Sequence, residues 1–213
     1  KKLIADLYRE HSALLHSDAL SALEKEEFQA LLQQKGSKAE LSNSLHTLCR
    51  MLHHVHGERV MLLIDEYDTP IHEAYANGYY NEAISFFRGL LSAALKDNVH
   101  AARGVMTGIL RIAKESIFSG LNNLGVYPLL RPEYSEYFGF TEDEVQELVN
   151  SMGQPELLTS LRSWYNGYLF GGRTVYNPWS VVEFLSSRDK QCRAYWVNTA
   201  GSAMIRAHVL SST

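Results

Sequence analysis

The segment Val60-Met61-Leu62-Leu63-Ile64-Asp65-Glu66-Tyr67-Asp68 decides the fold, because it joins an apolar run to a cluster of acids. The run 60–64 predicts a strand that is buried on both faces. The carboxylates that follow it each need a partner or a metal if they are buried. At the carboxyl end of a strand in an open α/β sheet, that partner is commonly a ligand. We therefore expect a ligand site at the tip of this strand.

The overall composition is that of an ordinary globular protein. Hydrophobic residues make up 46% and charged residues 21% of the chain, and the formal net charge is −4. A dedicated nucleic-acid-binding module usually carries a basic face, so this charge argues against that class. The cysteines, Cys49 and Cys192, form no C-x-x-C pattern, and no apolar run approaches the roughly 20 residues of a membrane span. We expect a reduced, cytoplasmic protein without a membrane span.

Residues 1–56 predict a helical leader, because leucines and other apolar residues recur there at spacings of three and four. Gly36 and Ser37 mark a break between two of its helices. Charged residues fill the remaining positions, as expected for helices with one wet face.

Residues 57–131 predict one half of an α/β core. A strand–helix–strand unit pairs its strands in parallel through a right-handed crossover. The segment from Asp68 through Asn77 and Gly78 is interpreted as a loop or a short turn. The expected elements are a strand at 60–64, an amphipathic helix around 83–95, a strand at 101–106 and a candidate third strand at 126–130.

Residues 132–213 predict a helical lid with one small hairpin. Thr141 and Glu144 form a capping box that begins a helix. Gly171 and Gly172 lie between two short β-prone runs and indicate the hairpin. Asn177, followed by proline, begins another helix as its N-cap.

Several blocks of sequence follow one another in a characteristic order. They are residues 63–71 (LIDEYDTPI), 107–124 (TGILRIAKESIFSGLNNL), 137–141 (YFGFT), 164–168 (WYNGY) and 176–180 (YNPWS). Together these blocks resemble the AAA-ATPase-like family, a P-loop group that is often fused to a PD-(D/E)XK nuclease-like domain. Their order and spacing agree with the family over most of the chain.

The resemblance implies an α/β fold with a truncated P-loop NTPase-type parallel sheet, flanking helices and a helical lid. The departure is that no phosphate loop of the form G-x-x-x-x-G-K-[ST] occurs in the 213 residues. The family's Walker A half is expected before residue 1 and its nuclease-like domain after the last residue. Nucleic-acid binding is therefore expected only through that absent domain.

The same resemblance raises a problem of strand pairing. The family's sheet order is expected to be 5-1-4-3-2, so the strands at 60–64 and 101–106 should pair, while 126–130 loses its neighbour. Exposed strand edges favour pairing with another chain. We expect self-association, or association with another domain, through these edges. A monomer in light scattering would contradict self-association.

Asp65 and Glu66 are the strongest site candidates. By resemblance, Asp65 would help to bind Mg²⁺ and ATP, and Glu66 would orient and polarise the hydrolytic water. The alternative is that both acids cap a helix or pair with a surface lysine. Asp68 is expected either to help hold the metal or to cap the chain before Pro70, with neither role favoured.

Thr107 resembles a sensor residue whose hydroxyl detects the γ-phosphate, and its alternative is a loop threonine that bonds to the backbone. Arg111 and Lys114 are cations that could stabilise the transferred phosphoryl group. Ion pairing with Glu115 or the nearby acids is the favoured interpretation for both. The chemistry of the polar block 114–124 does not follow from its residue types.

Histidines and aromatic residues suggest two further sites. A metal site is one interpretation of the histidines at positions 53, 54 and 56. Among the other possible ligands only Cys49 has matching helical spacing, so a solvated helix end is favoured. A group of lid aromatics could stack on single-stranded nucleic acid, but few basic residues accompany it, so packing in the lid core is favoured. The group is Trp164, Tyr165, Tyr168, Phe170, Tyr176 and Trp179.

Three functions compete at this point. The resemblance implies an intact parent that hydrolyses ATP with Mg²⁺, whereas this chain alone is expected to be inactive. The second is a non-enzymatic interaction scaffold, which the absence of G-K-[ST] from the natural gene would favour. The third is a metal-dependent nuclease that uses the acidic cluster. It predicts DNA cleavage without nucleotide, abolished by Asp65→Ala.

Overall fold

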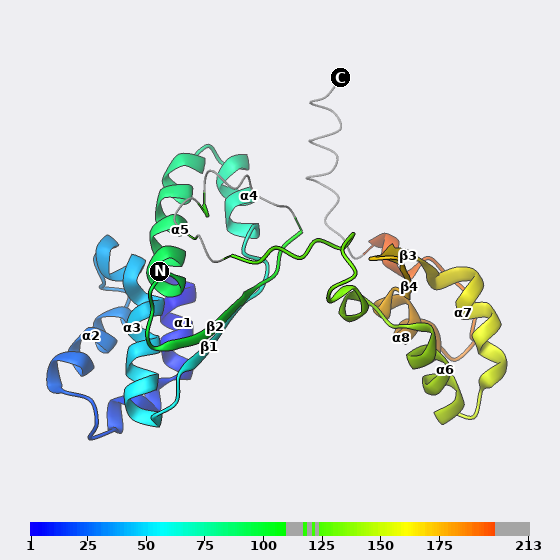
Figure 1. Ribbon diagram of the computed structural model, residues 1–213, viewed down its shortest axis with the longest axis horizontal. Helices are drawn as coiled ribbons and strands as arrows, with labels where there is room; N and C mark the ends of the chain where they lie inside the picture. Colours follow the sequence, from blue (N-terminus) through cyan, green and yellow to red (C-terminus); the bar gives the residue numbers. More distant parts are fainter. Residues whose placement is uncertain (110–116, 119–120, 122–123, 199–213) are drawn as a thin grey trace. The chain divides into compact units, whose positions relative to one another are not determined.

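In the computed structural model, residues 1–109, 117–118, 121 and 124–198 are described, and the chain forms two compact units (Figure 1). The first unit comprises Lys1–Leu124 and the second Gly125–Thr213. Each unit has its own hydrophobic core.

The helices predicted for residues 1–56 are present. Ser21 and Ser37 begin two of these helices with capping boxes. Each serine Oγ accepts the backbone N–H of Glu24 or Glu40, and each serine backbone N–H donates to the carboxylate of the same glutamate. Gly57 ends the last helix in the left-handed conformation, at a φ of 73°. The elements are α1 (Lys2–Glu10), the 3-10 helix η1 (Ser12–His16), α2 (Ala22–Leu32) and α3 (Lys38–His56).

The leader helices pack around one apolar cluster. Tyr8 lies at its centre, against the ring of Phe28 at a centroid distance of 4.7 Å. Its hydroxyl donates to the carbonyl of Ser44 at 2.8 Å, so the buried oxygen is satisfied. The buried members of the cluster are Tyr8, Leu14, Leu20, Phe28, Leu31, Leu41, Leu48 and Met51.

The predicted strands pair in parallel as expected, β1 over Val60–Ile64 and β2 over Ala101–Met106. Helix α5 (Tyr80–Leu95) connects them and contacts β2, and it also packs on α3 (Figure 1). A Cβ added at Gly104 would lie 2.3 Å from Cδ2 of Leu95. The Leu95 side chain of α5 therefore lies directly on this strand at Gly104, and it would have to shift for any larger residue there.

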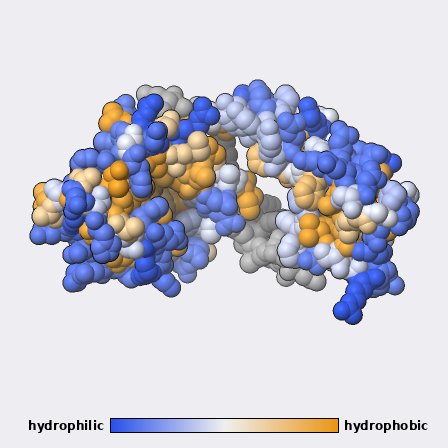
Figure 2. All heavy atoms as spheres, turned by 90° about the horizontal axis from the view of Figure 1, so that it is seen from below, coloured by the Kyte–Doolittle hydropathy of each residue, from blue (hydrophilic) through white to orange (hydrophobic). Residues whose placement is uncertain are grey.

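Within the part of the chain that the structure describes, the other face of this sheet is uncovered, so the prediction of a strand buried on both faces is wrong. Met61 is 59% and Leu63 69% exposed, and Val105, which pairs with Leu63, is exposed as well. Ile64 and Met106 point the opposite way and pack against the core. Alternate residues of a strand face opposite sides, and in the described residues only one side has an apolar layer. Figure 2 shows that hydrophobic residues reach the surface on both units.

The predicted loop after Asp68 is also wrong, because residues Thr69–Ala76 form helix α4. Pro70 lies in its first turn, where the fixed φ of proline suits a helix start. Ile71 and Ala74, three residues apart, are both buried in the core beside α5. Burial of one apolar face over two helical turns therefore stabilises a helix where the polar residues, proline and glycine had predicted a loop.

The second unit has the helices and the hairpin predicted for residues 132–213. The capping box of Thr141 and Glu144, the hairpin at Gly171 and the Asn177 cap are confirmed; Asn177 Oδ1 accepts the N–H of Ser180 at 2.9 Å. The elements are η2 (Ser135–Phe138), α6 (Glu142–Ser151), η3 (Pro155–Leu157), α7 (Leu158–Tyr165), β3 (Asn166–Phe170), β4 (Arg173–Tyr176), α8 (Pro178–Ser186) and η4 (Tyr195–Asn198).

Glu142 joins three of these lid elements. It accepts hydrogen bonds from Nε of Arg162, at 2.7 Å, and from the hydroxyl of Tyr176. Burial, together with this carboxylate, raises the pKa of Tyr176 to about 12. The tyrosine therefore stays a neutral donor at physiological pH.

The candidate third strand at 126–130 is absent from the structure. Pro128 lacks an N–H, and its carbonyl accepts the N–H of Arg131 at 2.9 Å, which makes a turn. The carbonyl of Leu129 accepts the N–H of Gly171 at 2.7 Å instead of a strand partner. The segment is therefore bonded to the lid hairpin.

The α/β class is confirmed by the parallel pair, its helices and the separate antiparallel hairpin. Two paired strands do not define the strand order of a P-loop sheet, so that finer assignment stays a prediction. Within the described residues, no helix is both long enough and apolar enough to cross a membrane.

Candidate functional site

The turns that follow β1 and β2 meet, as predicted for the ends of parallel strands. The N–H of Thr107 donates to the carbonyl of Ile64 at 2.9 Å. The N–H of Tyr67 donates to the carbonyl of Thr107 at 3.1 Å. Backbone pairing thus continues past the strand ends, and it brings Asp65 and Thr107 together across 42 residues of sequence.

Asp65 is exposed at this junction and is held by two donors. Its Oδ1 accepts the hydroxyl of Thr107 and the backbone N–H of Glu66, the latter at 2.9 Å. Both bonds reach the same oxygen, so the hydrogen bonds among the described residues leave Oδ2 for another ligand. An oriented, exposed carboxylate oxygen of this kind suits Mg²⁺, which prefers oxygen ligands.

Glu66 is exposed beside it, in an unusual backbone conformation. Its φ is 49°, in the left-handed region, which costs a residue other than glycine about 1–2 kcal/mol. Its Oε2 lies 3.4 Å from Oγ1 of Thr69, at the start of α4. Strained conformations of this kind cluster at functional sites, where the surrounding structure maintains them.

Asp68 differs from its neighbours, because its side chain is 1% exposed. Its Oδ2 accepts the backbone N–H of Ile109 at 3.0 Å and lies 3.4 Å from Nε2 of His72. Among the described residues, no three His, Cys, Asp or Glu side chains are arranged to hold a metal ion. The metal roles of Asp65 and Asp68 therefore stay predictions.

The other predicted residues of this site lie beyond the described part. Arg111 and Lys114 fall within residues 110–116, and most of the polar block 114–124 falls outside the described residues as well. Ile117 and Phe118 of that block are described and buried in the core beside α4 and α5. The catalytic roles of Glu66, Thr107 and Arg111 stay predictions.

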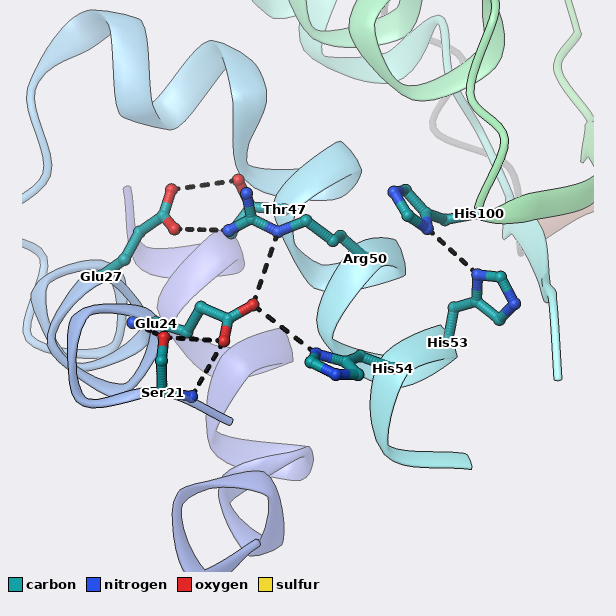
Figure 3. Close-up of polar contacts among 8 residues, drawn as sticks. All are labelled: Ser21, Glu24, Glu27, Thr47, Arg50, His53, His54 and His100. Carbon is teal, nitrogen blue, oxygen red and sulfur yellow. Dashed lines mark hydrogen bonds and ion pairs between the residues drawn. The ribbon is translucent and has the colours of Figure 1, made fainter. Parts of the chain in front are cut away.

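A second polar cluster joins α2 to α3, and the sequence did not indicate it (Figure 3). Arg50 donates to Oε2 of Glu27 at 2.7 Å and lies 3.9 Å from Oε1 of Glu24. His54 also lies 3.9 Å from Glu24. The only sequence signal for this network is the spacing of charged residues along each of the two helices. That spacing is compatible with many different ion pairs, so it does not identify these.

His53 is part of a histidine contact rather than a solvated helix end. Its Nδ1 lies 3.0 Å from Nδ1 of His100 (Figure 3). The ring of His46 lies edge-on to that of His100, with the ring centroids 5.7 Å apart. His54 and His56 are exposed, as predicted. Burial lowers the pKa of His100, and His53, His46 and Arg50 lower it further.

This lowered pKa makes folding sensitive to acid. The unfolded chain protonates His100 near its usual pKa of about 6.5, whereas the folded chain resists protonation. The unfolded state thus binds more protons as the pH falls through that value, and the free energy of unfolding decreases. We expect His100→Gln to flatten the loss of stability between pH 7.5 and 5.5 in urea titrations.

The control is His56→Gln, which removes an exposed imidazole outside the contact between His53 and His100. The difference between each variant and the wild type isolates one histidine from the carboxylates that also titrate on acidification. Equal slopes for His100→Gln and the wild type would contradict the prediction.

The lid aromatics do not all pack in the core, so that expectation is wrong in part. Tyr165 and Tyr176 are buried, but Trp164 is 57% and Trp179 48% exposed. Tyr168 is also exposed, on a hairpin strand whose outer face has no cover among the described residues. Aromatic spacing alone did not distinguish the two faces of these short elements.

Comparisons with known proteins place the chain among ATPase-like sequences. The family whose model matches residues 5–118 is described as "Predicted AAA-ATPase". The "Uncharacterized protein in vnfD 5'region" of Azotobacter chroococcum mcd 1 is 34% identical over 157 residues. The alignment covers 71% of this chain and 29% of that relative, so the chain spans less than a third of the relative's length. No solved structure matches the chain.

Proposed function

Because this chain belongs to the predicted AAA-ATPase family, we propose that it carries the metal-binding and water-activating half of an ATP-hydrolysing site. The observation that supports the proposal is the contact between Asp65 and Thr107 at the ends of two parallel strands. Ligands of open α/β sheets bind at the carboxyl ends of the strands.

Asp65 is the residue proposed to hold Mg²⁺. Its Oδ1 is fixed by Glu66 N–H and Thr107, so Oδ2 is oriented without further ordering. When bound, the ion supplies charge neutralisation for the phosphoryl group that is transferred. The donor set fits, since an exposed carboxylate is a ligand that Mg²⁺ accepts.

Glu66 is proposed to accept a hydrogen bond from the attacking water and to polarise it. Its exposed carboxylate lies one residue beyond Asp65, and its Oε2 lies 3.4 Å from Oγ1 of Thr69. Thr107 keeps Asp65 in place and offers a hydroxyl beside the metal position. Arg111 is proposed to stabilise negative charge on the transferred phosphoryl group. The sequence by itself favoured an ion pair with a neighbouring acid for this residue.

We propose that the phosphates of ATP are bound by residues outside these 213. The 213 residues contain no phosphate loop, and ATP affinity in such sites depends on the backbone N–H groups and the lysine of that loop. This chain alone is therefore expected to bind ATP no more tightly than about 1 mM. Hydrolysis is proposed for the intact protein.

The test is hydrolysis of Mg²⁺-ATP by the intact protein and its Asp65→Asn variant. The variant keeps the shape of the side chain but loses the charge that attracts the metal, so we expect the rate to fall by about 10²-fold or more. Asp18→Asn, an exposed aspartate in the leader, is the control and should keep the wild-type rate. Absence of Mg²⁺-dependent hydrolysis by the wild type, or an unchanged rate for Asp65→Asn, would overturn the proposal.

A further inference from the structure

Asp68 stands at the N-terminal boundary of α4 but does not cap that helix. An aspartate at this position normally accepts an N–H from the first turn of its own helix. Here no side-chain capping bond is formed, and Oδ2 accepts the N–H of Ile109 from the turn after β2. The carboxylate therefore connects two turns that follow different strands.

The turn after β2 lies unusually close to this carboxylate. A Cβ added at Gly108 would lie 2.8 Å from Oδ1 of Asp68 and 2.6 Å from Cε1 of Tyr67. Such distances are shorter than real contacts of a Cβ, so a larger residue at this position would displace the Tyr67 and Asp68 side chains from the turn 107–109. The bond to Ile109 and the close approach at Gly108 fix the same segment.

Thr107 is the residue on which this segment acts. It immediately precedes Gly108, and its hydroxyl donates to Asp65. Its backbone is fixed on one side by Ile64 and Tyr67. The bond from Ile109 to Asp68 fixes the other side, so the threonine is held at both ends.

We infer that Asp68 is a positioning residue, whose buried carboxylate holds the 107–109 turn in place and thereby keeps the Thr107 hydroxyl on Asp65. The inference rests on the proposed function for the chemistry of Asp65 and deepens it. It differs from both roles that the sequence suggested, since Asp68 neither binds the metal nor caps α4. His72, 3.4 Å away, supports the carboxylate from within α4.

Backbone hydrogen exchange tests this geometry without any activity. Asp68→Ala removes the acceptor, and the amide of Ile109 should exchange about tenfold faster, as expected from the loss of one hydrogen bond. Asp68→Asn retains an acceptor oxygen and should keep most of the protection. Asp65→Asn, which leaves the Ile109 bond intact, should keep all of it.

Kinetics of the intact protein separate positioning from metal binding. A positioning residue predicts that Asp68→Ala lowers kcat and leaves the Mg²⁺ concentration for half-maximal rate within about threefold, with partial rescue by Asp68→Asn. A metal ligand predicts instead that Asp68→Asn raises that concentration by about tenfold or more. That result, with normal Ile109 protection in Asp68→Ala, would overturn the inference.

Gly108→Ala provides a second route if Asp68→Ala does not fold. It separates the two turns by steric conflict while both carboxylates remain, and it should also expose the Ile109 amide to exchange. Unchanged protection in this variant would overturn the inference. A wild-type protein without ATPase activity would overturn the proposed function alone, because the exchange measurements would still report on Asp68.

Discussion

Glu66→Gln is expected to lower the rate of ATP hydrolysis by the intact protein by about 10²- to 10⁴-fold, the usual contribution of a positioned general base. The amide keeps the size of the side chain and an oxygen that can accept from Thr69. It loses the negative charge that would polarise water. ATP binding should persist, because the phosphates are bound elsewhere. Phosphate release and calorimetric titration with ATP measure the two properties separately.

Glu73→Gln is the matched control for this prediction, since Glu73 is an exposed glutamate of the neighbouring helix α4. It should hydrolyse ATP at the wild-type rate. Wild-type turnover by Glu66→Gln would show that Glu66 does not polarise the attacking water. The proposed role of Asp65 would then have to be tested without it.

The backbone strain at Glu66 gives the same position a second signature. Its φ of 49° favours glycine over alanine by about 1–2 kcal/mol. Glu66→Gly should therefore unfold at a higher urea concentration than Glu66→Ala, although both variants lack the carboxylate and both should be inactive. Function, rather than stability, would then account for a glutamate at this position.

The sequence predicted those parts of the fold that depend on local pattern. Both strands of the parallel pair match the predicted ranges, because an apolar run bounded by polar turns has few other solutions. The capping box of Thr141 and Glu144 follows from a threonine three residues before a glutamate. The meeting of Asp65 and Thr107 follows from parallel pairing alone.

The structural features that we did not predict from the sequence depend mainly on contacts between residues far apart in the chain. Asp68 bonds to a backbone N–H that lies 41 residues away, and no residue type signals a backbone donor. His53 and His100 meet across 47 residues. Helix α3 packs against β1, and the first residue of β1, Val60, donates its N–H to the carbonyl of His100. The open face of β1 escaped because an apolar run has the same pattern whether one face or both are covered.

Residues 126–130 do not form the predicted strand, and the reason for this can be tested in the second unit. Its Leu129 carbonyl accepts the N–H of Gly171, and the hairpin turn packs directly under residues 131–132. Gly171 has a φ of 54°, and a Cβ there would lie 2.3 Å from the carbonyl oxygen of Arg131 and 2.6 Å from Cα of Pro132. The hairpin and this segment therefore fit together only through glycine.

Gly171→Ala is accordingly expected to destabilise the second unit by about 2–5 kcal/mol, the sum of left-handed strain and overpacking against backbone that cannot move aside. Gly172→Ala is the matched control. Gly172 also has a positive φ, of 82°, but nothing lies within 4 Å of an added Cβ, so its cost should be about 1–2 kcal/mol.

Tryptophan fluorescence during urea unfolding measures this difference in the right unit, since all 3 tryptophans of the chain lie in the second unit, at positions 164, 179 and 196. The midpoint for Gly171→Ala should fall well below that for Gly172→Ala. Equal midpoints would mean that strain alone acts at both glycines. The contact between the hairpin and residues 129–132 would then contribute nothing to stability, and the reason given for the missing strand would fail with it.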